Sequence, residues 1–295
     1  MERDNTKMRE MLGYAMFRMA GVAAPRTAYA RVTVNGEYLG LFLAVEQIDE
    51  EFARHSFPDG GKGALFREIW PQGKSAAAYE TAMEFGNDKS AAAMQRFDED
   101  MIDSPIEEFL PLLKEWTDFK TLMKFLAVDR IIDNFDGYVG WYCSPQPCFN
   151  HNFYWYKEAF SDRVWLIPWD LDSSFNYPSP IRTSYGMPEW DVPPNCSFVK
   201  VFFGITGRPP SCDPFIHRLA QEAWHGYVEA SRELLDGPFE LEKLRGRIDQ
   251  YSALIAETVA EDPNGPSAIA WETAVTKLKS DLGPMRAYIE RKIAK

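Results

Sequence analysis

Strand-like and helical segments occupy separate parts of this chain, and that separation limits the folds open to it. Residues 27 to 48 are typical of two strands joined at Asn35-Gly36, a dipeptide that favours a two-residue hairpin turn, and "GALFREI" indicates a further strand. From Ser104 onward, apolar residues recur at helical spacing. Three amphipathic helices are expected to close the chain, at roughly 214 to 235, 239 to 260 and 266 to 293. Because strands and helices do not alternate, the sequence predicts an α+β fold with a small sheet-rich lobe and a larger helical lobe.

The segments between these elements are less regular. An amphipathic helix is expected in residues 8 to 19, before Gly21 and Pro25 end it. Residues 74 to 100 are polar and rich in alanine, which indicates a surface loop with a short helix. Two short aromatic strands are expected in "NFYWY" and "RVWLIPWDLD", where the tryptophans are read first as packing residues. Residues 177 to 214 hold many Pro, Gly, Ser and Asn and are predicted to be irregular.

Charge and hydropathy exclude two classes of partner. The 295 residues carry a formal net charge of −12, without any long run of Lys or Arg, so the field of the protein opposes binding to a phosphate backbone and nucleic acid is not an expected partner. No apolar run approaches the roughly 20 residues that a membrane-spanning helix needs. The residues after Met1 also lack the apolar core of a secretory signal, so no export signal is expected in this chain.

The four cysteines do not form a zinc motif. They lack Cys-x-x-Cys spacing, and the four His residues are scattered elsewhere. Cys143 and Cys148 lie in a proline-rich loop, "YCSPQPCF", which could close as a small disulfide hairpin and would then suit an oxidising compartment. Two free thiols are the alternative.

Three polar side chains stand at junctions between the predicted elements from Asp129 to Asp172. Asp136 follows a helix, Asn152 precedes a strand, and Asp170 follows the most apolar strand in this half of the chain. Side chains placed where strands end are held rigidly yet can face a cleft. Their oxygen atoms suit Mg²⁺ or Mn²⁺ bound together with substrate phosphates. The plainer alternatives are that Asp136 forms an ordinary Asp-Gly turn and that the acidic residues after the strand cap a turn.

The order of these parts is that of the protein-kinase catalytic machinery. There a loop Asp accepts the proton of the substrate hydroxyl, a following Asn binds one metal ion, and a later Asp binds metal ions that bridge the phosphates. The kinase signatures H-R-D and D-F-G are both absent from this chain. The order alone therefore indicates phosphoryl transfer only weakly.

Several stretches together resemble the CotH kinase family of atypical protein kinases, named after a bacterial spore coat protein. "DNFDGY", "HNFYWY" and "LIPWDLDSSF" look like its hallmark motifs. The resemblance extends upstream through "MREMLGYAMFRMAGVAAPR", "VTVNGEYLGLFLAVEQID" and "GALFRE", and downstream to a final helix ending "YIERKI". It covers nearly the whole chain and implies a two-lobe, kinase-like fold that transfers the γ-phosphoryl group of ATP to Ser or Thr of a protein substrate.

The resemblance also implies a domain plan and a set of site residues. Residues 1–295 would form one domain, with a partial nucleotide lobe in 1–72, a surface segment in 73–103 and a catalytic, helical lobe in 104–295. Asp136 corresponds to the catalytic Asp, and Asn152 and Asp170 correspond to the ligands of Mg²⁺ or Mn²⁺. Glu46, in "LAVEQID", lies where the adenine of ATP would dock, although it could equally be an exposed carboxylate at a strand end. Supporting roles are expected for Asp129, Asn134 and Asp172.

Two departures from the family pattern leave alternatives open. Asn152 follows Asp136 by 16 residues, whereas kinase catalytic loops have about five, so "GWYCSPQPCFN" looks like an insertion. The strands that in relatives precede the first helix, including one with a phosphate-contacting Lys, are not found in these 295 residues, so either the sequence is part of a longer protein or the nucleotide lobe is reduced. A non-catalytic surface or binding protein with the same fold is therefore the main alternative, and transfer of AMP is a weaker one. Family members are often exported, so an extracellular or cell-envelope location is expected.

Overall fold

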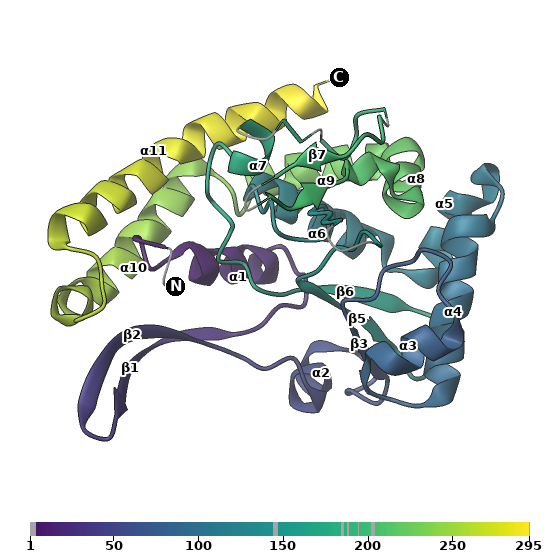
Figure 1. Ribbon diagram of the computed structural model, residues 1–295, viewed down its shortest axis with the longest axis horizontal. Coiled ribbons are helices and arrows are strands. Elements are labelled where there is room, and N and C mark those ends of the chain that lie inside the picture. The colour runs from purple at the N-terminus through teal and green to yellow at the C-terminus, as the bar shows by residue number, and fades with distance from the viewer. Residues whose placement is uncertain are drawn as a thin grey trace.

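The computed structural model describes residues 4–143, 147–183, 186–187, 189–193, 195–201 and 204–294 and has the mixed helix and strand content predicted for an α+β protein (Figure 1). The helices are α1 (Arg9–Met19), α2 (Glu50–Ser56), α3 (Ala76–Ala82), α4 (Asp88–Asp103), α5 (Ile106–Trp116), α6 (Phe119–Ile131), α7 (Pro180–Thr183), α8 (Pro214–Glu222), α9 (Trp224–Asp236), α10 (Leu241–Glu261) and α11 (Ala268–Ile293). The strands are β1 (Thr27–Val34), β2 (Glu37–Val45), β3 (Ala64–Arg67), β4 (Met83–Phe85), β5 (Phe153–Lys157), β6 (Val164–Pro168), β7 (Val199–Lys200) and β8 (Thr206–Gly207). None of the described helices is both long and apolar enough to cross a membrane.

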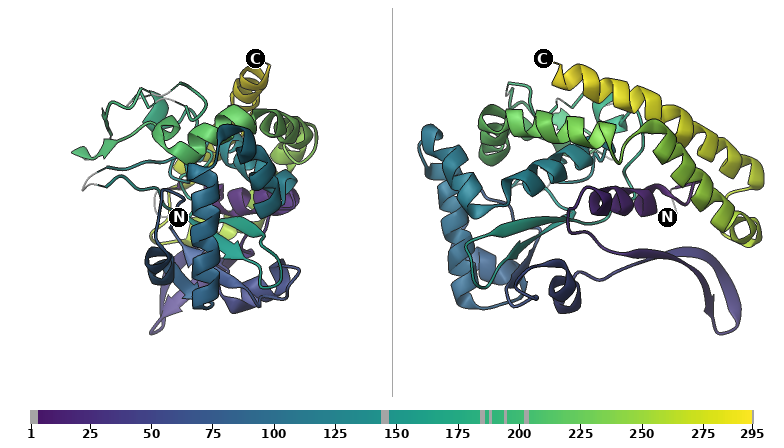
Figure 2. Two further views of the ribbon diagram at one scale, coloured as in Figure 1. Left: turned by 90° about the vertical axis from the view of Figure 1, so that its right-hand side faces the viewer. Right: turned by 180° about the vertical axis from the view of Figure 1, so that it is seen from behind.

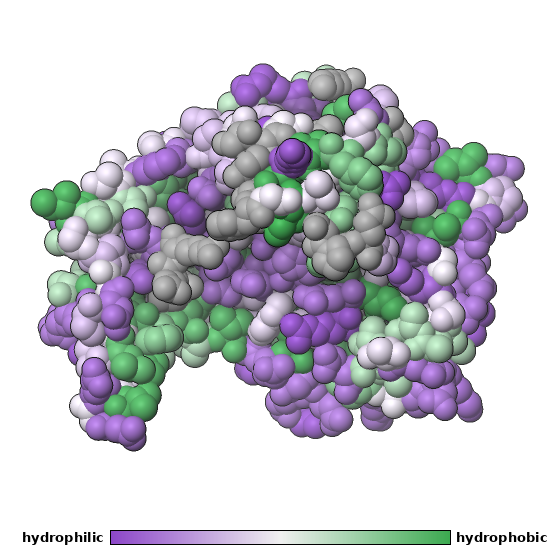
Figure 3. Space-filling model, viewed as in Figure 1, coloured by the Kyte–Doolittle hydropathy of each residue, from purple (hydrophilic) through white to green (hydrophobic). Residues whose placement is uncertain are grey.

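The predicted hairpin at Asn35-Gly36 is confirmed. β1 and β2 pair antiparallel, and both turn residues have positive φ, 51° for Asn35 and 86° for Gly36, as the twist of a two-residue hairpin requires. The hairpin forms a sheet of its own and extends away from the rest of the molecule beside α10 (Figure 2). Apolar side chains remain on its surface, including Val34 and Phe42 (Figure 3).

A four-stranded antiparallel sheet with strand order β4-β3-β5-β6 lies between two layers of side chains. Alternate residues of β5 point to opposite faces of the sheet, so they enter different cores. On one face Trp155 packs against Phe97 of α4, with ring centroids 5.4 Å apart, and on the other Tyr156 stacks on Phe57 at 4.0 Å. Burying a large apolar side chain stabilises a fold by about 1.5–3 kcal/mol, so these aromatic residues anchor the sheet from both sides.

The prediction of a surface loop with a short helix in residues 74 to 100 is wrong about the loop, because this segment forms two helices and a strand, namely α3, β4 and most of α4. The side chain of Asn87 caps α4 by accepting the N–H of Ser90. Asp98 is fully buried and accepts hydrogen bonds from the N–H groups of Gly73 and Lys74 and from the Tyr79 hydroxyl. Alanines and a buried carboxylate give little apolar periodicity, so the packing of α4 could not be read from local sequence.

The helices that close the chain are four instead of the predicted three. The segment 214 to 235 divides at Ala223 into α8 and α9, because α8 packs against α4 and α5 whereas α9 packs against α6. α10 and α11 have nearly the predicted ranges. Within the irregular stretch 177 to 214, the described residues form only the short elements α7, β7, β8 and a 3₁₀ turn at Pro210–Cys212, and positions 184–185, 188, 194 and 202–203 lie outside the described residues.

Two disulfides join the four cysteines. Cys143 is bonded to Cys148, which settles the alternative left open by the sequence, and Cys196 is bonded to Cys212, a pairing that the sequence did not indicate. The second bond connects residues 16 positions apart and ties the irregular stretch to the start of α8. Residues 144–146 of the proposed loop insertion lie outside the described residues.

Replacing Cys196 and Cys212 by Ser should lower the free energy of unfolding by about 3 kcal/mol, because a cross-link restricts the unfolded chain in proportion to the logarithm of loop length. The matched variant Cys143→Ser with Cys148→Ser opens a loop with a separation of only 5 residues and should lose less, about 2 kcal/mol. Urea unfolding of both variants measures the difference. A larger loss from the short loop would contradict this ranking.

Candidate active site

Three strands of the four-stranded sheet end at one edge and bring three polar residues together there. Because β3, β5 and β6 are antiparallel neighbours, the residue after β3, Glu68, the residue before β5, Asn152, and Asp170 beyond β6 lie at the same edge. The backbone continues the pairing at this point, since the N–H of Glu68 donates to the carbonyl of Phe153 at 3.2 Å and that of Trp169 to the carbonyl of Asn152 at 3.1 Å. The sheet therefore supports this edge rigidly.

All three of these residues have left-handed backbone conformations. Their φ angles are 50° for Glu68, 65° for Asn152 and 48° for Asp170. Asn and Asp adopt this conformation more readily than other residues with a side chain, and bulky residues do so only at a cost of about 1–3 kcal/mol. The left-handed residue turns each strand sharply, which places the side chain at the sheet edge instead of in the core.

Asp136 is held against this edge by Asn152. The amide nitrogen of Asn152 donates to the backbone carbonyl of Asp136 at 2.9 Å and to its Oδ2 at 3.3 Å. The other carboxylate oxygen, Oδ1, accepts the Tyr142 hydroxyl at 2.5 Å and lies 3.2 Å from Nε2 of His151. Burial opposes the charge on His151, but its contacts with Asp136 outweigh that effect and raise the pKa of the imidazole. The structure thus brings Asp136 and Asn152 into contact.

A buried polar cluster below the loop fixes the position of Asp136. Arg130 donates from Nε to Oδ2 of Asp129 at 3.0 Å, and Asn134 donates from Nδ2 to Oδ1 of the same residue at 2.7 Å. Burial raises the pKa of Asp129, although Arg130 and Asn134 oppose this shift. A Cβ atom on Gly137 would lie 2.5 Å from Nδ2 of Asn134, so only glycine fits where the loop passes over this cluster. Asp129 and Asn134 accordingly contact the loop that carries Asp136.

The first helix adds a carboxylate that the sequence did not single out. Glu10 of α1 has a pKa raised to about 7, mainly by burial and then by the charges of Asp170 and Asp172. In the next turn of α1, the Tyr14 hydroxyl accepts the N–H of Asp170 at 3.0 Å. Burial, followed by Asp172 and Asp136, also raises the pKa of Asp170. Several carboxylates therefore repel one another here, an arrangement that a cation would stabilise.

The donor set fits a hard divalent cation that is shared with a phosphate ligand. The described residues donate no hydrogen bond to the carboxylate oxygens of Asp170, and the amide nitrogen of Asn152 points to Asp136, which leaves its Oδ1 as an acceptor. In the parts of the chain that the structure describes, no group of three or more His, Cys, Asp or Glu side chains is placed to hold a metal ion. Mg²⁺ usually binds through one or two carboxylates together with waters and phosphate oxygens, and Asn152 and Asp170 match that pattern.

Glu46 interacts with a different set of residues. Its carboxylate accepts the backbone N–H of Arg26 at 2.9 Å, forms an ion pair with the Arg26 guanidinium, and lies 2.9 Å from Nε2 of His55. Burial raises the pKa of Glu46, but the hydrogen bonds from Arg26 and His55 outweigh burial and lower it to about 2. The predicted contact of Glu46 with adenine stays a prediction, and its carboxylate would have to exchange these partners to make it.

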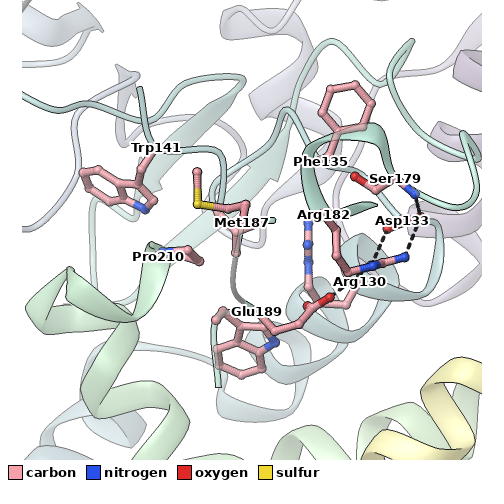
Figure 4. Close-up of a pocket in the computed structure, with 11 residues that line it drawn as sticks. Arg130, Asp133, Phe135, Trp141, Ser179, Arg182, Met187, Glu189 and Pro210 are labelled. Atoms are coloured by element: carbon pink, nitrogen blue, oxygen red, sulfur yellow. Dashed lines mark hydrogen bonds and ion pairs between the residues drawn. The ribbon is translucent and has the colours of Figure 1, made fainter. Parts of the chain in front are cut away.

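A small cavity behind Phe135 is closed by ion pairs (Figure 4). Arg182 lies 3.1 Å from Oδ1 of Asp133 and 3.0 Å from Oε1 of Glu189, and Arg130 lines the same wall. The cavity measures about 30 Å³, which is room for one or two water molecules and not for a nucleotide. The ion pairs that line the cavity hold the chain next to Asp136, and the cavity itself is too small to be a ligand site.

A comparison with known protein families shows to which family this chain belongs. The family model described as CotH kinase protein matches residues 1–292. The chain belongs to the CotH kinase family. Inner spore coat protein H of Bacillus subtilis (strain 168) is 24% identical to it over 186 residues, which cover 59% of this chain and 48% of the relative. The chain thus aligns with about half the length of that curated relative.

Three residues of the site in this CotH kinase family member were missed by sequence reasoning. Glu68 is the last residue of "GALFRE", and its Oε1 accepts the N–H of Asn152 at 3.1 Å. Tyr142 lies in the loop insertion and donates to Asp136. Glu10 lies on the predicted first helix beside another charged residue, Arg9, and nothing in "MREMLGYAMF" singled it out.

The carboxyl of Glu10 should make the metal-free protein less stable as the pH rises. Its pKa is about 7 in the folded state against an ordinary value of 4.5, so the folded protein binds the proton more tightly than the unfolded chain. The stabilisation is complete below pH 4.5 and is lost as the pH rises through 7, on the order of 2 kcal/mol in all. Urea unfolding in EDTA across this range measures it. Glu10→Gln should flatten the pH dependence, and an equally steep loss in that variant would contradict the assignment.

Proposed function

We propose that this protein is an atypical protein kinase of two-lobe, kinase-like fold that transfers the γ-phosphoryl group of ATP to Ser or Thr of a protein substrate. The observation that carries the proposal is the meeting of Asp136, Asn152 and Asp170, from three separate chain segments, at one edge of the four-stranded sheet. Membership of the CotH kinase family supports the same reaction class.

The roles of the three residues follow from their surroundings. Asp136 would accept the proton of the substrate hydroxyl, because Tyr142 and His151 occupy its Oδ1, whereas the one contact of Oδ2 with a described residue is the 3.3 Å contact with Asn152. Asn152 and Asp170 would hold Mg²⁺ or Mn²⁺, which neutralises negative charge on the phosphates as the phosphoryl group moves. Glu46 is proposed to contact the adenine. Asp129 and Asn134 would position the loop, and Asp172 would reinforce the negative potential at Asp170.

The test is a calorimetric titration with ATP in the presence and absence of Mg²⁺, followed by incubation with a mixture of candidate proteins. Metal-dependent binding and metal-dependent incorporation of phosphate are expected. Binding without incorporation, or no heat beyond dilution, would contradict the kinase proposal. Mass spectrometry of the modified protein separates transfer of a phosphoryl group from transfer of AMP, because the two additions differ in mass.

A non-catalytic binding protein is the second candidate. The observation that favours it is that β1 and β2 form a separate two-stranded sheet, which does not join the four strands that carry the site residues. A nucleotide bound between the two sheets would have only the two strands of the β1–β2 hairpin on one side. This candidate predicts that the titration with ATP and Mg²⁺ gives no binding at any concentration reached.

We also propose an extracellular or spore-coat location. Disulfides persist in oxidising surroundings, and this chain has two. The curated relative is named as an inner spore coat protein, which fits the same environment. Fractionation of the producing cells with an antibody against the protein would test the location.

A further inference from the structure

A positively charged hollow lies at the end of the four-stranded sheet opposite the candidate active site. The turn between β5 and β6 forms one wall, and the first turns of α4 form the other. The hollow measures about 390 Å³, more than ten times the cavity beside Phe135. Four cationic side chains line it, namely Lys62, Lys89, Arg96 and Lys157.

Two acidic side chains, Glu158 and Asp162, share the hollow with the four cations and offset only part of their positive charge. Glu158 is buried and its two oxygens accept the Ser161 hydroxyl and the Trp165 indole N–H. Asp162 is exposed and lies 3.8 Å from Nζ of Lys157. The other three cations, Lys62, Lys89 and Arg96, form no ion pair with any described residue. A chain with a net charge of −12 thus concentrates unpaired positive charge at one place.

The base of the hollow is rigid. Lys157 is only 7% exposed, and its ammonium donates to the backbone carbonyls of Glu158 at 2.9 Å and Ser161 at 2.5 Å. These bonds fix the turn between β5 and β6 and hold a buried positive charge beneath the opening. The N-terminal end of α4, a helix of 16 residues, adds the positive end of its dipole to the same wall.

The rim combines this charge with an exposed aromatic ring. The side chain of Phe160 is 77% exposed, and Nζ of Lys62 lies 5.6 Å from its ring centroid. An isolated phosphate ion would use the cations but leave the ring in water. A peptide that carries acidic groups beside an apolar residue would cover both features.

We propose that this hollow binds an acidic peptide segment, whose negative charge comes from clustered Asp and Glu carboxylates, and that it recruits the protein substrate. The proposal rests on the function proposed above, because recruitment presupposes transfer at Asp136. Peptide binding is measured separately from transfer, so the two proposals fail in different experiments. Binding should be electrostatic and should weaken as the salt concentration rises.

The test uses the whole protein and short fluorescein-labelled peptides in an anisotropy assay. One peptide contains Asp, Glu and a single Phe, a second replaces the acidic residues by phosphoserine, and a third replaces them by Ser and Gln. The acidic peptide should bind, and the neutral peptide should bind at least about tenfold more weakly. Binding of the phosphoserine peptide without binding of the acidic peptide would overturn carboxylates as the recognised groups.

The matched variants reverse the same number of charges inside and outside the hollow. Lys89→Glu with Arg96→Glu should weaken binding of the anionic peptide at least about tenfold. The control, Lys120→Glu with Arg245→Glu, changes two cations in exposed ion pairs on α6 and α10 and should leave the affinity unchanged. Circular dichroism and thermal melting confirm that both variants fold.

The proposal is overturned if the wild-type protein binds none of the peptides, if it binds the neutral peptide as tightly as the anionic ones, or if Lys89→Glu with Arg96→Glu binds like the control. Asp170→Ala should retain peptide affinity. Intact binding together with absent phosphoryl transfer in the wild type would contradict the proposed function and leave the hollow as a binding site.

Discussion

Asp170→Ala should reduce phosphoryl transfer on the order of 10³-fold, because loss of the metal ligand removes several kcal/mol of charge stabilisation in the transition state. The stability should change little, since relief of the repulsion from Asp172 and Asp136 offsets the cost of placing Ala in the left-handed backbone conformation of this position. Incorporation of labelled phosphate at saturating Mg²⁺ measures the activity, and urea unfolding measures the stability.

The control for this variant is Asp172→Ala, which removes a neighbouring carboxylate whose hydrogen bond with a described residue comes from the Ser173 hydroxyl, at 3.1 Å. That variant should lose much less activity than Asp170→Ala. Unchanged phosphate incorporation by Asp170→Ala would contradict the assignment of the metal ligand. Equal losses in the two variants would show that the negative potential matters there and not a specific ligand.

Asp136→Asn should lower the turnover number by about 10²–10³-fold while metal affinity changes little, because the substitution removes a base and keeps the shape of the side chain. The amide oxygen of an asparagine can still accept the hydroxyl of Tyr142, so the loop should stay in place. Steady-state kinetics give the turnover number, and titration with Mn²⁺ gives the metal affinity. The pair of variants is informative because Asp170→Ala should show the opposite pattern, a loss of metal affinity.

A matched test of positioning is Asn134→Ala, which removes a hydrogen bond to Asp129 below the loop without touching Asp136. It should lower the turnover number by less than Asp136→Asn and should also lower thermal stability. If Asp136→Asn kept the turnover of the wild type, Asp136 would be a turn residue and not a catalytic one.

Local sequence patterns predicted the elements whose formation depends on near neighbours. The hairpin at Asn35-Gly36 required only two residues with positive φ, and the strands β5 and β6 required only short aromatic runs. α4 was missed because its burial depends on distant partners, as with Asp98, which accepts hydrogen bonds from Gly73 and Lys74. Whether residues 1–72, 73–103 and 104–295 behave as separate parts stays a prediction.

The residues of the candidate site also include some that the sequence could predict and some that it could not. Asp136, Asn152 and Asp170 could be named from the sequence because each stands at a junction and matches a family motif. Glu10 could not, since its proximity to Asp170 arises only when α1 packs beside the end of β6. The partner of Cys196 was equally hidden, because a disulfide depends on distance in space and not on spacing in the chain.

The left-handed residues at the sheet edge have a consequence for how substitutions there should be interpreted. A saturation library selected only for folding would enrich Asn, Asp and Gly at positions 152 and 170, because the backbone alone favours them. Finding Asn or Asp at these two positions is therefore poor proof of activity, since folding and chemistry select the same residues. Position 68 is different. Its backbone conformation favours glycine, whereas the contact with the N–H of Asn152 favours the glutamate found there. Among relatives, retention of that glutamate would therefore show that its contact with Asn152 is kept, which the backbone conformation alone does not explain.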